Sequence, residues 1–192
     1  MESDRLVTPI DFDDFEVGAK IDYVTIATPG QCRLPALDGT RKWSRKEHYR
    51  RLSIHDPSPG DVHILRNALC NPEILELEVA VDFRPKGMSS REEHSAKLKQ
   101  VYRDLLAGLH PYGAILMSRD VMGVFNPFKG GLEPCDMRLP TTTYQAVWGH
   151  RTHPAQVKLY VKEIDQGQGL DWQRHVTRVE VRLSGEGLTA HG

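Results

Sequence analysis

Residues 141–183 read TTTYQAVWGHRTHPAQVKLYVKEIDQGQGLDWQRHVTRVEVRL and contain three segments with the pattern of β-strands. In the clearest two, apolar and polar residues alternate, which is the period of a strand with one buried face. The segments HRTHPA and DQGQGLDWQ between them read as turns. The order predicts a meander of antiparallel strands at 141–149, 155–164 and 175–183.

Upstream of the meander, the sequence predicts two more strands and two helices. KIDYVTIATPG at 20–30 and EILELEVAVDFRP at 73–85 read as strands. A helix at 56–72 has Ser58 as N-cap, and a helix at 89–113 begins with a capping box of Ser90 and Glu93. This order predicts an α+β fold with a central antiparallel sheet and helices packed on one face.

Composition narrows the class of protein. The 192 residues carry a net charge of -1, with 39% hydrophobic and 27% charged residues, as in a soluble globular protein. We expect an acidic arm at 1–18 and a single domain at 19–192. The chain ends with LTAHG soon after its last predicted strand, which also fits truncation of a longer protein at its C-terminus.

Cysteine usage and hydropathy indicate the compartment. The three cysteines are widely spaced and odd in number, which favours a reducing, cytoplasmic setting and argues against a zinc knuckle. No apolar run approaches the roughly 20 residues that span a bilayer, so we expect no membrane partner.

Three patterns could carry chemistry, and each has an ordinary structural alternative. Carboxylates share one face of the 73–85 strand and could bind a hard divalent ion, or they could simply be solvated. Glu180 could join them, or could form cross-strand ion pairs with its arginine neighbours. Tyr160 lies between Lys158 and Lys162. It could be a nucleophile with supporting cations, or simply an exposed tyrosine of a strand.

Residues 41–51, RKWSRKEHYRR, combine six Lys and Arg residues with two aromatic residues. Cations interleaved with aromatic rings are typical of surfaces that follow a nucleic-acid backbone. The alternative is a solvated basic segment. We expect DNA contacts from Arg41, Lys42, Trp43, Arg45, Lys46, Arg50 and Arg51, and also from Lys158.

The segments LEVAVDF, TYQAVWGHRTHPAQVKLYVKEID and TRVEVRL, in this order, resemble the rolling-circle replication initiators of filamentous phages and related plasmids. This family belongs loosely with the HUH nucleases, and the resemblance covers about residues 74–184. It implies that Tyr160 is the nucleophile and Lys162 its attendant lysine. It also implies metal ligation by Glu78, Asp82 and Glu180. The family's HxH triplet is absent, so His150 and His153 are substitutes by proximity only.

The resemblance implies a site-specific DNA endonuclease and strand transferase. A tyrosine would become linked to the 5′ phosphate of single-stranded or hairpin DNA at a replication origin, with Mg²⁺ or Mn²⁺ as cofactor and host replication proteins as candidate partners. Two other functions stay open from the residues alone. One is a nucleic-acid-binding module that does not cut, and the other is a protein- or small-molecule-interaction domain, which the near-neutral charge favours.

Overall fold

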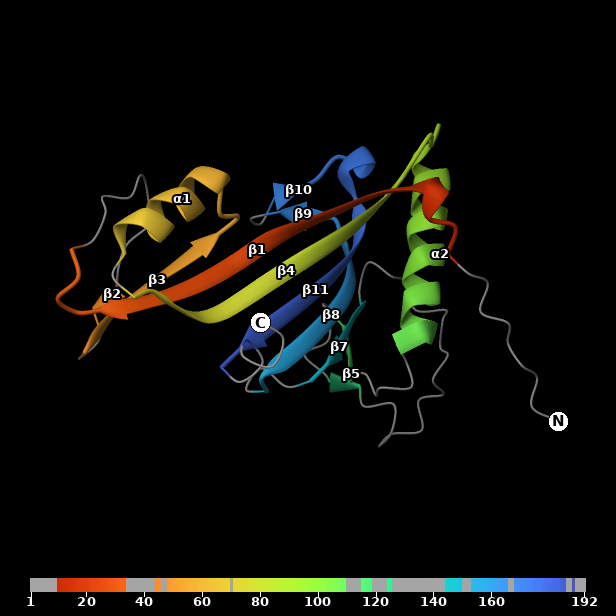
Figure 1. Cartoon of the computed structure of the whole chain (residues 1–192). Helices are drawn as coiled ribbons and strands as arrows, with labels where there is room; N and C mark the ends of the chain where they lie inside the picture. The colour runs from red at the N-terminus through yellow and green to blue at the C-terminus, as the bar shows by residue number, and fades with distance from the viewer. Residues whose placement is uncertain are drawn as a thin grey trace. The chain divides into compact units, whose positions relative to one another are not determined.

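A computed structural model describes residues 10–33, 44–45, 48–69, 71–109, 115–118, 124–125, 144–149, 153–165, 168–185 and 188. The helices are α1 Pro59–Ala68 and α2 Arg91–Leu109, with short 3-10 turns η1 Phe12–Asp14 and η3 Trp172–Arg174. The strands, shown in Figure 1, are β1 Phe15–Pro29, β2 Ser44–Arg45, β3 Tyr49–His55, β4 Glu73–Pro85, β5 Ile115–Ser118, β6 Val124–Phe125, β7 Tyr144–Trp148, β8 Ala155–Lys162, β9 Ile164–Asp165, β10 Gln168–Gly169 and β11 Val176–Ser184.

The main sheet has the strand order β2-β3-β1-β4-β11-β8-β7-β5-β6, and β9 and β10 form a separate pair. Strand pairs β1–β3, β2–β3, β5–β7 and β7–β8 are antiparallel. The α+β prediction with an antiparallel sheet is therefore confirmed. The predicted strands at 73–85, 155–164 and 175–183 correspond to β4, β8 and β11. These three are neighbours in the sheet, and β11 lies between β4 and β8.

The chain divides into two compact units, each assembled from separated segments. The α2 unit comprises Met1–Ala19, Val81–His150 and Val157–Glu180, and the α1 unit comprises Lys20–Ala80, Arg151–Gln156 and Val181–Gly192. Strands β1, β4, β8 and β11 contribute residues to both units. That residues 19–192 form one domain stays a prediction.

In the α1 unit, helix α1 packs on strands β1 and β3. Val24 and Ile26 of β1 lie opposite Ile54 and Leu52 of β3, and these four form a core with Leu65 and Leu69 of the α1 segment. The helix starts where the sequence predicted. The Ser58 hydroxyl accepts from the Asp61 backbone N–H at 3.1 Å, and the Asp61 carboxylate accepts from the Ser58 N–H at 2.8 Å.

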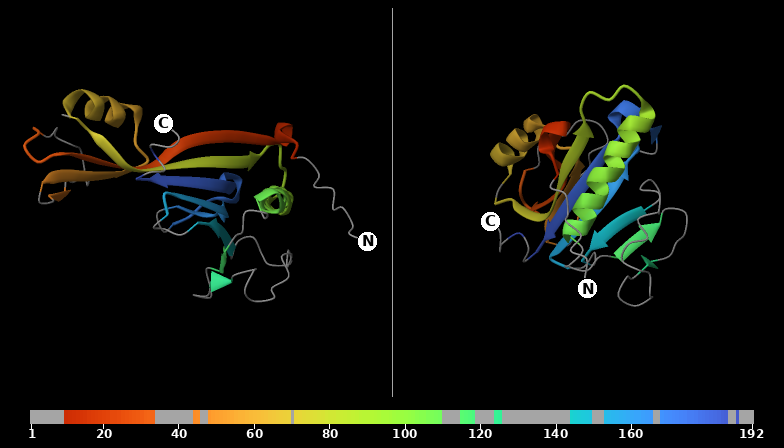
Figure 2. Two further views of the ribbon diagram at one scale, coloured as in Figure 1. Left: turned by 60° about the horizontal axis from the view of Figure 1, so that its bottom comes forward. Right: turned by 90° about the vertical axis from the view of Figure 1, so that its right-hand side faces the viewer.

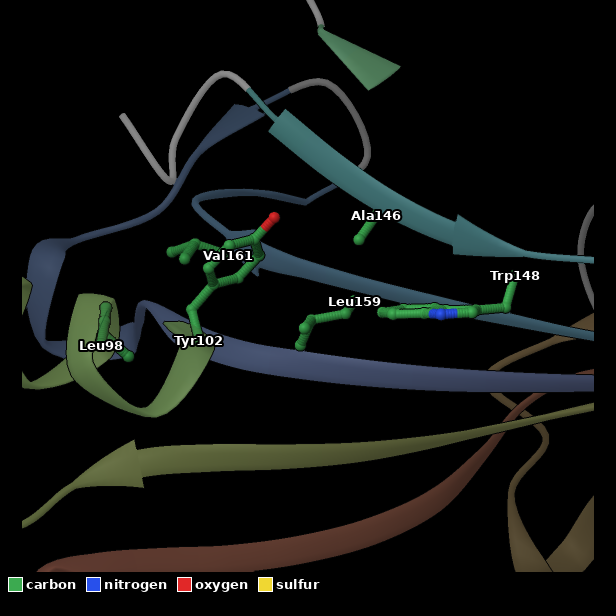
Figure 3. Close-up of a cluster of buried hydrophobic side chains, with 6 residues drawn as sticks. All are labelled: Leu98, Tyr102, Ala146, Trp148, Leu159 and Val161. Atoms are coloured by element: carbon green, nitrogen blue, oxygen red, sulfur yellow. The ribbon is translucent and has the colours of Figure 1, made fainter. Parts of the chain in front are cut away.

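In the α2 unit, helix α2 covers one face of the strands of its unit (Figure 2). Leu98 and Tyr102 of α2 pack on Leu159 and Val161 of β8, together with Trp148 of β7 (Figure 3). Leu159 has no exposed surface and Val161 has 1%. The apolar face of β8 therefore faces α2, as its alternation predicted.

The start of α2 uses a variant of the expected capping box. The Ser90 hydroxyl accepts from the Glu93 backbone N–H at 3.2 Å, as expected. The Glu93 carboxylate, however, accepts from the backbone N–H of Ser89 at 3.0 Å and from the Ser89 hydroxyl at 2.8 Å. These bonds lower the pKa of the exposed Glu93 carboxyl, with the Ser89 side chain as the main cause.

One expectation from sequence needs correction, and one feature of β11 was not predicted. Strand β1 begins at Phe15 and is preceded by η1, so part of the segment expected to be a loose arm at 1–18 has regular structure. Phe15 is buried with Phe83 of β4 and Val101 of α2, which explains the earlier start of the strand. In β11 the polar face is also buried, because Arg178 and Glu180 are 3% and 5% exposed.

We predict that Leu159→Ala destabilises the protein by about 2–5 kcal/mol, because it removes buried methyl groups and leaves a cavity between β8 and α2. Denaturant unfolding measures the change. The matched control is Ile164→Ala, since Ile164 is 50% exposed and its loss should cost less than about 0.5 kcal/mol. Equal losses for the two variants would contradict this account of the core.

Candidate active site on strands β8 and β11

Strand β8 presents three polar side chains on the face away from α2. Since Leu159 and Val161 pack on the helix, alternation directs Lys158, Tyr160 and Lys162 to the opposite face. All three side chains are half-buried. The structure thus places Tyr160 between two lysines on one face, as the sequence predicted.

Strand β11 carries two buried charges on one face. Arg178 and Glu180 are two residues apart, so their side chains point the same way from the strand. Buried charges are costly unless oppositely charged partners and hydrogen bonds compensate them. Their contacts therefore decide what this part of the sheet can do.

Glu180 is the centre of the group. The Tyr160 hydroxyl donates a hydrogen bond to Glu180 Oε1. Lys158 Nζ donates to Glu180 Oε2 at 2.9 Å. Arg178 Nη1 lies 3.8 Å from Glu180 Oε1. One buried carboxylate is thus held by two cations and a phenol.

Arg178 links Glu180 to Asp82 of β4. Arg178 Nε donates to Asp82 Oδ1 at 2.6 Å, and Nη2 donates to Asp82 Oδ2 at 2.7 Å, which is a bidentate pair. Positive and negative groups therefore alternate from Lys158 through Glu180 and Arg178 to Asp82. This alternation compensates the charges that the sheet buries.

Two tyrosines in the α2 unit have a raised pKa, for different reasons. Burial alone raises the pKa of Tyr102 to about 12. Burial is also the largest cause for Tyr160, but the charge of Glu180 and its hydrogen bond raise the pKa further, against a smaller lowering by Arg178. Tyr160 is therefore a phenol at neutral pH, and its proton is already shared with a carboxylate.

Such an arrangement suits nucleophilic attack with proton removal by a neighbouring base. This arrangement differs from the expected one, in which lysines would stabilise a Tyr160 phenolate. Lys158 contacts Glu180, and Lys162 Nζ lies 2.8 Å from Asp165 Oδ1. The Tyr160 hydroxyl and the Glu180 carboxylate thus form an acid–base pair that is already hydrogen-bonded.

Carboxylates on two strands are candidate metal ligands. Glu78 lies on β4 in the α1 unit, and Glu180 lies on β11 in the α2 unit. Oxygen-only donors of this type suit hard divalent ions such as Mg²⁺. Glu180 retains acceptor capacity, because a carboxylate offers about four lone-pair sites.

The other proposed metal ligands are placed differently. The Asp82 carboxylate is paired with Arg178. His153 is exposed in the turn before β8. His150 lies outside the described residues.

The predicted DNA-binding segment is described only in part. Arg41, Lys42, Trp43 and Lys46 lie outside the described residues. Arg50 and Arg51 are half-buried in β3, and Arg51 Nη2 lies 3.8 Å from Glu76 Oε2. Arg45 of β2 lies opposite Arg50 in the strand register.

Sequence reasoning assigned one residue of this region incompletely. Arg178 was assigned to cross-strand pairing around Glu180, and its partner turns out to be Asp82. Only strand order, which short-range patterns do not give, identifies that partner.

Comparisons with known proteins were limited. No family model and no curated protein matches the sequence. One solved structure that matches is a rolling circle replication initiator protein from Geobacillus stearothermophilus, with 9% identity, coverage of 91% of this chain and 77% of that chain, and a TM-score of 0.39. A likeness this weak shows neither the family nor the function. Neither described helix is long and apolar enough to cross a membrane.

We predict that Arg178→Met destabilises the protein by about 3–5 kcal/mol, because it leaves Asp82 and Glu180 without their shared cation in a buried setting. Thermal or denaturant unfolding measures the loss. Arg84→Met is the matched control, since Arg84 and its partner Glu16 are 45% and 65% exposed and such pairs contribute about 0–1 kcal/mol. A loss no larger than that of the control would show that the buried pair is not needed for folding.

Proposed function

We propose that this chain is a DNA-nicking replication initiator, in which Tyr160 becomes linked to the 5′ phosphate of single-stranded origin DNA. The observation that carries the proposal is the hydrogen bond from the Tyr160 hydroxyl to the buried Glu180 carboxylate. The sequence resemblance of residues 74–184 to rolling-circle initiators supports the same residue as nucleophile. Neither the binding module nor the interaction domain requires a phenol paired with a buried base.

In the proposed reaction, the Tyr160 oxygen attacks the phosphorus of one phosphodiester. The phenolic proton passes to Glu180 Oε1 as the new oxygen–phosphorus bond forms. The bond between phosphorus and the 3′ oxygen breaks, and that oxygen takes a proton from water or from the protonated carboxyl. The products are a phosphotyrosyl link to the 5′ end and a free 3′ hydroxyl that can prime synthesis.

The cations around Tyr160 have separate roles in this proposal. Lys158 keeps the Glu180 carboxylate oriented through its 2.9 Å bond to Oε2. Arg178 fixes the same carboxylate from the other side and is itself fixed by Asp82. Lys162, the attendant lysine of the resembling family, would stabilise negative charge at the tyrosyl oxygen or the phosphate.

A divalent metal is part of the proposal. Glu180 would supply an oxygen ligand to Mg²⁺ or Mn²⁺, with Glu78 as the further ligand that the resemblance implies. Asp82 would contribute only on release from Arg178, and His153 and His150 are the weakest candidates. The ion would supply Lewis-acid polarisation of the scissile phosphate.

We predict that Tyr160→Phe binds single-stranded DNA like the parent protein but forms no covalent adduct, because only the attacking oxygen is lost. Denaturing electrophoresis with labelled origin-like DNA and Mn²⁺ measures the adduct, and mass spectrometry locates the linked peptide. Tyr144→Phe is the control and should keep the adduct. An adduct on Tyr144 would reassign the nucleophile, and DNA binding without any adduct from the parent would favour the module that does not cut.

The pH dependence tests the role of Glu180. Since the pKa of Tyr160 lies above its ordinary value near 10, reaction through a free phenolate would rise about tenfold per pH unit between pH 7 and 9. Direct proton transfer to Glu180 predicts a much weaker rise in the single-turnover rate. Glu180→Gln should slow the reaction and restore the steep dependence. A steep profile in the parent protein would remove Glu180 as the base.

We predict that neutralising Arg45, Lys46, Arg50 and Arg51 weakens binding to single-stranded DNA and flattens its salt dependence. Each lost phosphate contact should reduce the slope of log affinity against log salt by about 0.7. Anisotropy titrations at several salt concentrations measure the slope. Neutralising Arg84 and Arg174 serves as the control, and an unchanged slope in the four-residue variant would show that the segment does not contact DNA.

A further inference from the structure

A pocket in the α1 unit lies where β1 ends and where β3 and β4 begin. Its volume is about 380 Å³, within the roughly 300–1,000 Å³ of small-ligand sites. The lining combines one aromatic ring with polar and apolar groups, and is formed by Ala27, Thr28, Pro29, His48, Tyr49, Asn71, Glu73 and Leu75. We refer to it as the Tyr49 pocket.

Three of its polar side chains are available to a ligand. Tyr49 is 38% exposed, and Asn71 and Glu73 are exposed as well. Within the described residues, none of the three side chains makes a hydrogen bond or ion pair. A flat ring, an amide and a carboxylate therefore border one hollow without partners of their own in the described chain.

The polar groups of the pocket suit the edge of a flat nitrogen base. The exposed ring of Tyr49 can stack on such a base. Glu73 offers carboxylate acceptors and Asn71 an amide in the same lining. A ligand with a flat ring that carries hydrogen-bond donors on its edge would satisfy these groups.

We infer that the Tyr49 pocket binds an unpaired guanine base, with Tyr49 stacking on the base and Glu73 reading its edge. This inference rests on the proposed function only in taking single-stranded DNA as the main source of the base. Stacking on an exposed aromatic ring is the usual way in which proteins hold an unpaired base.

The carboxylate selects guanine among the four bases. Guanine presents two adjacent donors, N1–H and the N2 amino group, which match the two oxygens of Glu73. Its O6 accepts from the Asn71 amide. Adenine and cytosine offer one amino donor beside an acceptor nitrogen, and thymine offers one N–H between two carbonyl oxygens, so each leaves a carboxylate oxygen facing an acceptor.

Fluorescence anisotropy tests this inference in the Tyr160→Phe background, where no DNA is cleaved. The probes are an all-thymidine oligonucleotide and the same strand with one central deoxyguanosine or one central deoxycytidine. We expect about tenfold tighter binding of the guanosine strand, as for a good bidentate base contact. Glu73→Gln should abolish this preference, and Glu92→Gln, which changes an exposed carboxylate on α2, should keep it.

The ring is tested separately. Tyr49→Ala should weaken binding of the guanosine strand about tenfold, as expected for loss of one stacking contact, and Tyr49→Phe should bind like the parent. Titration with dGMP separates the sources of the base. If dGMP binds as tightly as the strand, the pocket takes free nucleotides; if the strand binds more tightly, it takes bases of DNA.

Two results would overturn the inference. They are equal affinity for the three strands, and a guanosine preference that survives Glu73→Gln. The proposed nicking activity is judged independently by the Tyr160 adduct. A guanosine preference without any adduct contradicts nicking alone, and an adduct without the preference contradicts the pocket alone.

Discussion

The buried carboxylate of Glu180 is the group on which the arrangement of the candidate site depends. A charge that is only 5% exposed in the middle of a strand must be compensated where it lies. Lys158, Arg178 and the Tyr160 hydroxyl supply that compensation. Lys158 and Tyr160 lie on the adjacent strand β8, and Arg178 lies on the same strand β11. The pairing of β8 with β11 therefore fixes both the compensation of the Glu180 charge and the surroundings of the Tyr160 hydroxyl.

This dependence changes how Tyr160 can react. The groups that bury the phenol also raise its pKa, which disfavours the phenolate form. The same hydrogen bond nevertheless places a proton acceptor on the phenol oxygen, which the proposed nicking reaction would use. Reactivity would then come from the alignment of the phenol with its base and not from ionisation of the free side chain. The position of Tyr160 opposite the α2 core keeps this face separate from the packing that stabilises the unit.

Local patterns predicted much of the fold. The alternation of Leu159 and Val161 gave the buried face of β8, and Ser58 marked the start of α1. The patterns failed where a distant segment decides. Phe15 belongs to a strand because Phe83 and Val101 bury it. The polar face of β11 is buried because Asp82, almost a hundred residues earlier, pairs with Arg178. For the candidate site, spacing put Tyr160 and its lysines on one face, but only the pairing of β8 with β11 brings Glu180 to the Tyr160 hydroxyl.

The way the two compact units share strands has a consequence for dissecting the protein. The chain passes from one unit to the other five times, and four of these passages lie within β1, β4, β8 and β11. A contiguous fragment such as 81–150 would lack the β8 and β11 segments that complete its core. Neither unit can therefore be expressed as one uninterrupted piece of chain. Engineering that aims to isolate Tyr160 and its partners in a smaller protein would need circular permutation or designed loops that join strand ends.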